Sequence, residues 1–393
     1  MNIALAELAQ TKYFNHLKII AGRNGLWRPI ESCGWLDYEF EKILKNRYIY
    51  SNFSKNQLVI TTFLFAKDNS FLTRDAIRHL IEIDAGGLVV NNVFGLTIPD
   101  SILRYADTKE FPVFEVTSQP FDMAAFTISV TDYIRDLAMA DFGDKEIGAL
   151  LHSPTTRDGV RSSAFRMNPS FLHQITVLYM RKEGVLGDDE YVDLVSAYRQ
   201  SVLYDHRNAL YRFQNGLMYI ISDDAIEEKA TKGYIERLVE TITGSSADYS
   251  SGLSDLHYDL GELDRAMQEA IYAAMGNRGA SESLTRYSDL GSYQAILPLA
   301  DQPAMIEYSA KVTEPLVEYD ASCNTSLLDT LLRYVSCEGN LHELARVMGQ
   351  HENTLRYRFT QIEKITGKNP IRSGDYEQLA LAAKIIISRK MMW

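Results

Sequence analysis

The feature that most constrains the fold of this chain is a run near its end that predicts two short helices joined by a tight turn, residues 340–349 and 353–364. Asn340 is suited to cap the first helix and Gly349 to end it, while Asn353 or Thr354 is suited to cap the second. Apolar residues recur at three- and four-residue steps, so each helix has one stripe to bury against the other. These residues are Leu341, Leu344, Ala345, Met348, Leu355, Phe359 and Ile362.

The second predicted helix carries polar residues opposite or beside its apolar stripe, where they are free to meet DNA. Arg and Gln can pair with guanine and adenine edges, while Thr, Tyr and Lys suit phosphate oxygens. Arg358 projects only about 60° from the stripe and could instead pair with a carboxylate inside the domain. A helical hairpin with a solvated polar face is the alternative. The candidate DNA-contacting residues are His351, Asn353, Thr354, Arg356, Tyr357, Arg358, Gln361 and Lys364.

Residues 351–358, His-Glu-Asn-Thr-Leu-Arg-Tyr-Arg, resemble the H-x-N-T-L-x-Y-R run of the PucR/CdaR family of bacterial transcription regulators. Four flanking segments follow the family's order and spacing, residues 316–320, 327–331, 339–341 and 362–367. The resemblance implies a ligand-responsive, sequence-specific regulator, an activator of catabolic genes, that is not an enzyme and needs no cofactor. Its implied partners are double-stranded DNA, a small-molecule metabolite effector, further copies of the chain in a homodimer or larger homo-oligomer, and RNA polymerase.

The distribution of charge is compatible with DNA binding at one end only. The 393 residues carry a net charge of -12, but residues 324–393 hold ten Lys and Arg against seven Asp and Glu. This excess is small, so we expect one copy to bind weakly and a dimer on two half-sites to add affinity. The sequence contains no run of 18 apolar residues and no basic leader, which predicts a cytoplasmic protein. Cys33, Cys323 and Cys337 lack metal-ligand spacing and are expected to be free thiols.

Residues 1–121 alternate strand-like and helix-like runs, which predicts an α/β domain with a largely parallel sheet. This order resembles the sensory domain of the same family, although residues 45–52 replace a more glycine-rich run and leave the ligand open. Ligands of such sheets bind near strand ends, so the candidate effector-binding residues are Trp35, Thr61, Thr62 and Asn91. The predicted strands are 17–21, 57–62, 87–90 and 111–116, and the predicted helices are 73–83 and 99–107.

Residues 122–151 predict a long connecting helix, with a possible break near Gly143, that either pairs with its copy in a dimer or packs on its own domain. Residues 152–290 resemble a diguanylate-cyclase-like (GGDEF) domain of α+β type. Residues 212–218 occupy the place of its signature but lack both acids that would hold a divalent metal. The expected elements are strands 175–181, 209–213, 217–222 and 249–253, and helices 191–202, 227–242 and 261–275.

Residues 291–393 predict an all-α DNA-binding domain with a helix-turn-helix at 340–366. No catalytic motif and no metal site is expected, because the acidic clusters at 188–190 and 223–224 suit helix starts and solvated loops. Two functional alternatives remain. One is a nucleotide-cyclase-like enzyme, and the other is an interaction module that does not bind DNA.

Overall fold

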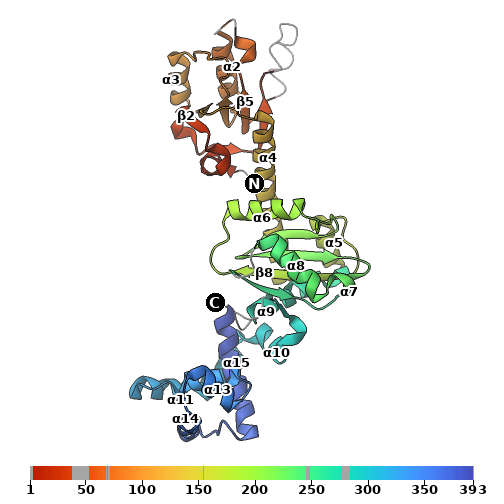
Figure 1. Cartoon of the computed structure of the whole chain (residues 1–393), viewed down its shortest axis with the longest axis vertical. Helices are drawn as coiled ribbons and strands as arrows, with labels where there is room; N and C mark the ends of the chain where they lie inside the picture. The colour runs from red at the N-terminus through yellow and green to blue at the C-terminus, as the bar shows by residue number, and fades with distance from the viewer. Residues whose placement is uncertain are drawn as a thin grey trace. The chain divides into compact units, whose positions relative to one another are not determined.

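The computed structural model describes residues 3–37, 53–67, 69, 71–153, 155–244, 248–276 and 284–392 (Figure 1). The run at 45–52, which departs from the family pattern, lies outside these residues. The chain forms two compact units, one of residues 1–145 with 186–199 and the other of residues 146–185 with 200–393.

The first unit contains a five-stranded sheet of order β2-β7-β6-β5-β4, in which β4 to β7 run parallel and β2 is antiparallel to β7. The predicted parallel sheet is therefore confirmed. Strand β4 was not predicted, because Ser-Cys-Gly-Trp has no β-branched residue. The elements are β1 (Ile3–Ala4), α1 (Leu5–Leu8), β2 (Leu17–Ala21), β3 (Pro29–Ile30), β4 (Ser32–Trp35), β5 (Gln57–Thr61), α2 (Phe71–Glu82), β6 (Gly87–Val90), α3 (Asp100–Thr108) and β7 (Val113–Val116).

The core of this sheet explains why its central strands are continuous apolar runs. All four residues of β6 are buried, as expected for a parallel strand with both faces covered. Ile77 of α2 and Ala106 of α3 join Val59 of β5 and Leu88 of β6 in one apolar cluster. The buried stripes of the two helices thus supply the cover that the sheet requires.

A helix covers the residues predicted to connect the domains: α4 (Met123–His152) continues unbroken through Gly143. Helix α6 (Asp188–Gln200) is fastened to it by polar contacts. Buried Asp136 accepts two hydrogen bonds from Arg199 Nη1, at 2.7 and 2.8 Å, and the Tyr133 hydroxyl donates to Asp189 at 2.8 Å. The acids at 188–190 lie in the first turn of α6, where the helix dipole favours negative charge.

The second unit contains a five-stranded sheet of order β12-β11-β8-β10-β9, antiparallel except for the parallel pair β11–β12. The predicted hairpin is present, with Gln214 and Asn215 as its two turn residues and Gln214 at φ +50°. The prediction of a single helix at 227–242 is wrong, because the structure has two helices there, separated at Ala230 and Thr231. The elements are α5 (Arg157–Met167), β8 (Ile175–Lys182), β9 (Ala209–Phe213), β10 (Gly216–Ser222), α7 (Ile226–Lys229), α8 (Lys232–Thr243), β11 (Tyr249–Leu253), α9 (Leu263–Met275) and β12 (Leu284–Arg286).

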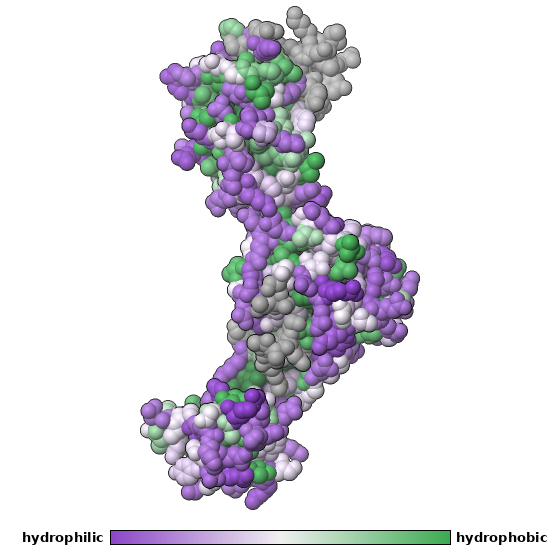
Figure 2. Space-filling model, viewed as in Figure 1, coloured by the Kyte–Doolittle hydropathy of each residue, from purple (hydrophilic) through white to green (hydrophobic). Residues whose placement is uncertain are grey.

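The chain after β12 is helical, as predicted. Leu316, Leu331, Leu344, Leu355 and Leu379 come from five successive helices and are fully buried in one cluster. No helix among the described residues is long and apolar enough to cross a membrane. Figure 2 shows hydrophilic residues over most of the visible surface, with hydrophobic ones in small patches. The helices are α10 (Tyr293–Ile296), α11 (Pro303–Cys323), α12 (Leu327–Ser336), α13 (Leu341–Met348), α14 (Glu352–Thr366) and α15 (Ser373–Met392).

Candidate nucleic-acid interface

Helices α13 and α14 form the predicted helix-turn-helix, and its ends are closed by side chains and glycines. The Asn340 side chain accepts hydrogen bonds from the N–H groups of His342 and Glu343, and Gly349 ends α13 at φ +60°. The capping residue of α14 is His351, whose Nδ1 accepts from Asn353 N at 3.2 Å. The prediction that Asn353 or Thr354 caps α14 is wrong, because the helix begins at Glu352 and both residues lie in its first turn.

The two sides of α14 divide as the helical periodicity predicted. Leu355, Phe359 and Ile362 are buried against the other helices of the domain. Tyr357, with 65% of its surface exposed, points away from this buried stripe. The helix therefore presents a continuous polar side to solvent, formed by the exposed residues Asn353, Thr354, Arg356, Tyr357, Thr360 and Lys364, with His351 exposed at its start and Gln361 half-buried.

Acidic residues accompany the cations at the start of this interface. Glu352 lies 3.3 Å from His342 Nδ1 and 3.7 Å from Arg356 Nη2. On α13, the hydrogen bond from Arg346 lowers the pKa of Glu343. These pairs are exposed, so they are weak and are readily exchanged for other partners. The Arg356 guanidinium is consequently held near the N-terminal turn of α14 but is available to a nucleic acid.

Arg358 differs from its neighbours on α14. It is half-buried, and its Nη1 donates to Thr330 Oγ1 at 2.7 Å and to Ser326 Oγ at 3.3 Å. The expected carboxylate partner is replaced by two hydroxyl groups, at the start and in the middle of α12. Because these partners lie 28 and 32 residues earlier in the chain, helical periodicity could not have identified them.

The candidate effector residues Trp35, Thr61, Thr62 and Asn91 meet along the carboxyl edge of the parallel sheet, at the ends of β4, β5 and β6. Their side chains are engaged with other residues of the first unit. The two threonine hydroxyls donate to Asp37, at 2.7 and 3.0 Å, and the Asn91 side chain accepts from Gln119 at 2.5 Å. The Trp35 indole donates to Thr127 Oγ1 at 2.7 Å. The structure thus brings the predicted residues together and shows internal partners for each.

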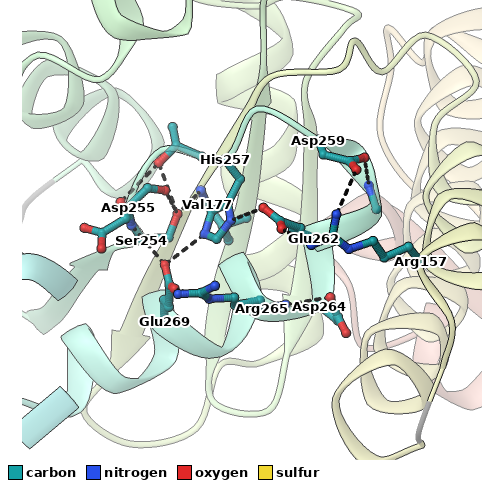
Figure 3. Close-up of polar contacts among 12 residues, drawn as sticks. Arg157, Val177, Ser254, Asp255, His257, Asp259, Glu262, Asp264, Arg265 and Glu269 are labelled. Carbon is teal, nitrogen blue, oxygen red and sulfur yellow. Dashed lines mark hydrogen bonds and ion pairs between the residues drawn. The ribbon is translucent and has the colours of Figure 1, made fainter. Parts of the chain in front are cut away.

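A buried ion cluster in the second unit escaped the sequence analysis, because its members are spread over one loop and the helix that follows. His257 lies between two carboxylates, with Nδ1 3.2 Å from Glu262 and Nε2 2.9 Å from Glu269 (Figure 3). Arg265 Nε donates to the other oxygen of Glu269 at 3.0 Å. An ionised carboxylate only accepts hydrogen bonds, so this placement between two carboxylates favours the protonated imidazole, in which both ring nitrogens donate. Opposite charges satisfy one another here, which is the arrangement of a structural ion cluster.

Neither the hairpin nor the acidic clusters form a metal centre in the part of the chain that the structure describes. Gly216 and Leu217 begin β10 and are buried, and they supply no carboxylate. Asp223 is instead paired with Lys229 at 2.6 Å and Arg207 at 3.3 Å. The described residues contain no group of three or more His, Cys, Asp or Glu that could hold a metal ion.

Comparison with known proteins gives two family matches, one in the N-terminal third of the chain and one near its C-terminus. Residues 7–134 match the purine catabolism regulatory protein-like family, and residues 327–385 match the PucR C-terminal helix-turn-helix domain. The second match begins with α12 and ends within α15, so it contains the whole candidate interface. Residues 135–326 lie outside both matches.

Individual relatives cover smaller shares of the chain. An uncharacterized protein of Mycobacterium tuberculosis is 28% identical over 153 residues, 38% of this chain and 35% of that protein. The DNA-binding transcriptional activator AdeR of Bacillus subtilis is 24% identical over 121 residues, 30% of this chain and 29% of AdeR. The aligned region thus spans about a third of the length of these curated relatives.

Among solved structures, the regulator of polyketide synthase expression from Bifidobacterium adolescentis aligns with 62% of this chain and 98% of its own, at 16% identity. The TM-score is 0.29, which supports no argument about the fold. The two family matches carry the assignment instead. They show that residues 7–134 are similar to the purine catabolism regulatory protein-like family and that residues 327–385 are similar to the PucR C-terminal helix-turn-helix domain.

Proposed function

We propose that this chain is a ligand-responsive, sequence-specific DNA-binding regulator that activates catabolic genes in the cytoplasm. The observation that carries the proposal is the exposed polar side of α14, within the segment that matches the PucR helix-turn-helix domain. In helix-turn-helix proteins the second helix enters the major groove with its N-terminal residues toward base edges. In this chain those residues are Asn353, Thr354, Arg356 and Tyr357.

The proposed contacts divide by chemistry. Arg356 and Gln361 are suited to bidentate pairing with base edges, whereas Thr354, Tyr357 and Lys364 are suited to phosphate oxygens. His351 and Asn353 lie at the start of α14, beside N–H groups that can themselves face a phosphate. Base-edge contacts supply preference for sequence, and phosphate contacts supply affinity and orientation.

Substitution of Arg356 tests the proposal. Repeated selection with the full-length chain from a library of random duplexes is expected to recover a preferred DNA sequence. Arg356→Ala should then weaken binding to that sequence by about 1 to 3 kcal/mol and relax the preference at one base position. Binding isotherms of the wild type and the variant provide the measurement.

The matched control is Arg237→Ala, which removes an exposed arginine from α8 and should leave binding unchanged. Failure of the wild-type chain to enrich any sequence would contradict DNA recognition and favour an interaction module. An Arg356→Ala protein with unchanged affinity and preference would remove Arg356 from the interface.

We further propose four functional parts: an effector-binding domain at 1–121, a connecting helix at 122–151, a degenerate GGDEF-like domain at 152–290 and a DNA-binding domain at 291–393. The order of strands, hairpin and helices in the third part, without the metal-holding acids, supports a fold used for assembly or signal relay. A homodimer is proposed because one domain with three excess positive charges has little affinity alone. An activator would also contact RNA polymerase.

The effector is proposed to bind at the carboxyl edge of the first sheet, near Trp35, Thr61, Thr62 and Asn91, where parallel sheets hold ligands. Binding would displace some of the internal hydrogen bonds of these residues. A screen of purines and sugar acids should find a compound that raises the melting temperature of the full chain. Thr62→Val should abolish that rise, and an unchanged response in the variant would place the effector elsewhere.

A further inference from the structure

The Arg358 side chain joins the proposed recognition helix to a neighbouring helix. Its Nη1 is 2.7 Å from Thr330 Oγ1 and 3.3 Å from Ser326 Oγ. Thr330 is fully buried, and its hydroxyl donates in turn to Ser326 O at 2.8 Å. Arg358 therefore reaches into a small polar site on α12, whereas Arg356 and Tyr357 on the same turn of α14 are exposed.

Aromatic and aliphatic side chains of α12 and α14 also pack together in the apolar cluster of the domain. The rings of Tyr334 and Phe359 lie with their centroids 4.6 Å apart and at 50° to one another. Apolar packing holds two helices together but is not directional. A hydrogen bond from a charged group is directional and stronger than a neutral one. The Arg358 contact thus adds a directional restraint on rotation of α14 to the packing of its buried apolar side chains.

We propose that Arg358 is a positioning residue, which acts through Thr330 and Ser326 to set which exposed side chains of α14 face the base edges. The proposal rests on the proposed function of DNA recognition and assigns Arg358 a role other than contact with DNA. Recognition contacts need to be held to within roughly 0.5 Å by their supporting residues. A buried threonine that holds the arginine from inside the domain provides such support.

The test uses Thr330→Val in the full-length chain, because Thr330 is fully buried and cannot itself touch DNA. The probe is the duplex that the wild type selects from a random-sequence library, with an unselected random duplex beside it. We expect Thr330→Val to lose roughly tenfold in affinity for the selected duplex, the scale of one hydrogen bond to a charged group. Binding to the random duplex should be unchanged.

Two further variants separate positioning from a general loss of structure. Thr330→Ser keeps the hydroxyl and should restore the preference for the selected duplex. Arg358→Ala should lose affinity to the same degree as Thr330→Val, and the double variant should lose no more than the worse single variant, because both changes remove one interaction.

The dependence of affinity on salt gives the decisive readout. A positioning residue leaves the slope of log affinity against log salt unchanged, while loss of a phosphate contact reduces it by about 0.9. A reduced slope for Arg358→Ala, with wild-type affinity for Thr330→Val, would overturn the proposal and make Arg358 a phosphate contact. Should Thr330→Val fail to fold, Arg358→Gln leaves α12 intact. The salt dependence of its affinity then still distinguishes a positioning residue from a phosphate contact. A wild type that selects no duplex would instead refute the proposed function.

Discussion

At the scale of single residues, His257 shows how a buried charge is tolerated in this chain. Burial opposes the charged imidazolium, but hydrogen bonds to Glu269 and Glu262 outweigh it and raise the pKa of His257. Burial likewise opposes the charge on Glu269, yet the hydrogen bond from His257 leaves the pKa of that carboxyl lowered. Each charge favours the other, so removal of either group should leave a buried charge with only its second partner, Arg265 for Glu269 or Glu262 for His257.

The raised pKa of His257 predicts a pH-dependent stability. A group whose pKa is higher in the folded chain stabilises it fully below the unfolded value of 6.5, and this contribution is lost as pH rises through the folded value. Each pKa unit of difference corresponds to about 1.4 kcal/mol. We expect the melting temperature of the wild type to exceed that of His257→Gln most below pH 6.5, and the difference to narrow as pH rises through the raised pKa of His257.

Thermal unfolding of both proteins across this range measures the gap. His206→Gln serves as the control, because His206 is largely exposed and lies 3.8 Å from its nearest carboxylate oxygen, so its removal should cost little at any pH. A gap between wild type and His257→Gln that stays constant with pH would mean that the imidazole is not charged in the folded chain.

At the scale of elements, the packing of α9 on the second sheet depends on one glycine in β11. A Cβ atom at Gly252 would lie 2.0 Å from Ala274 N and 2.3 Å from Ala270 O. Both are backbone atoms of α9, so strand and helix would have to separate. Gly252→Ala is therefore expected to destabilise the chain by about 1 to 3 kcal/mol, the usual cost of overpacking.

The comparison variant is Gly148→Ala in the interior of α4, where a Cβ would meet no atom within 4 Å. Alanine favours the helix over glycine by roughly 0.5 to 1 kcal/mol, so this variant should be more stable than the wild type. Denaturant unfolding of both variants measures whether the free energy of unfolding falls for Gly252→Ala and rises for Gly148→Ala. Equal stability of Gly252→Ala and wild type would show that α9 shifts without cost.

The sequence predicted elements better than it predicted the contacts between them. Strands β5 and β6 follow from short continuous apolar runs, and helices α13 and α14 follow from the three- and four-residue spacing of their apolar residues. The cap of α14 was misassigned because His351, which is not among the usual capping residues, accepts the hydrogen bond in place of Asn353. The Arg358–Thr330 and His257–Glu269 contacts depend on tertiary packing. The spacing of these residues along the chain therefore does not reveal that they meet.

At the scale of the whole molecule, the uneven distribution of charge bears on how the chain would bind DNA. Residues 324–393 carry a net charge of +3 and the remainder carries -15, so the long-range field of the chain repels a nucleic acid. One helix-turn-helix domain with three excess positive charges has few cations with which to neutralise DNA phosphates. We therefore expect tight binding only from the proposed dimer, in which binding of the second domain is intramolecular.

A dimer of helix-turn-helix domains predicts a strict dependence on the spacing of half-sites. Two recognition helices on one face of DNA read half-sites about 10 to 10.5 base pairs apart, or a multiple of this. Insertion of about five base pairs between the half-sites of the selected duplex turns one half-site to the opposite face. We expect affinity to fall to that of a duplex with a single half-site, and insertion of about ten to restore part of it. Titration of the full chain against the three duplexes gives the result, and an affinity that ignores spacing would show that each copy binds independently.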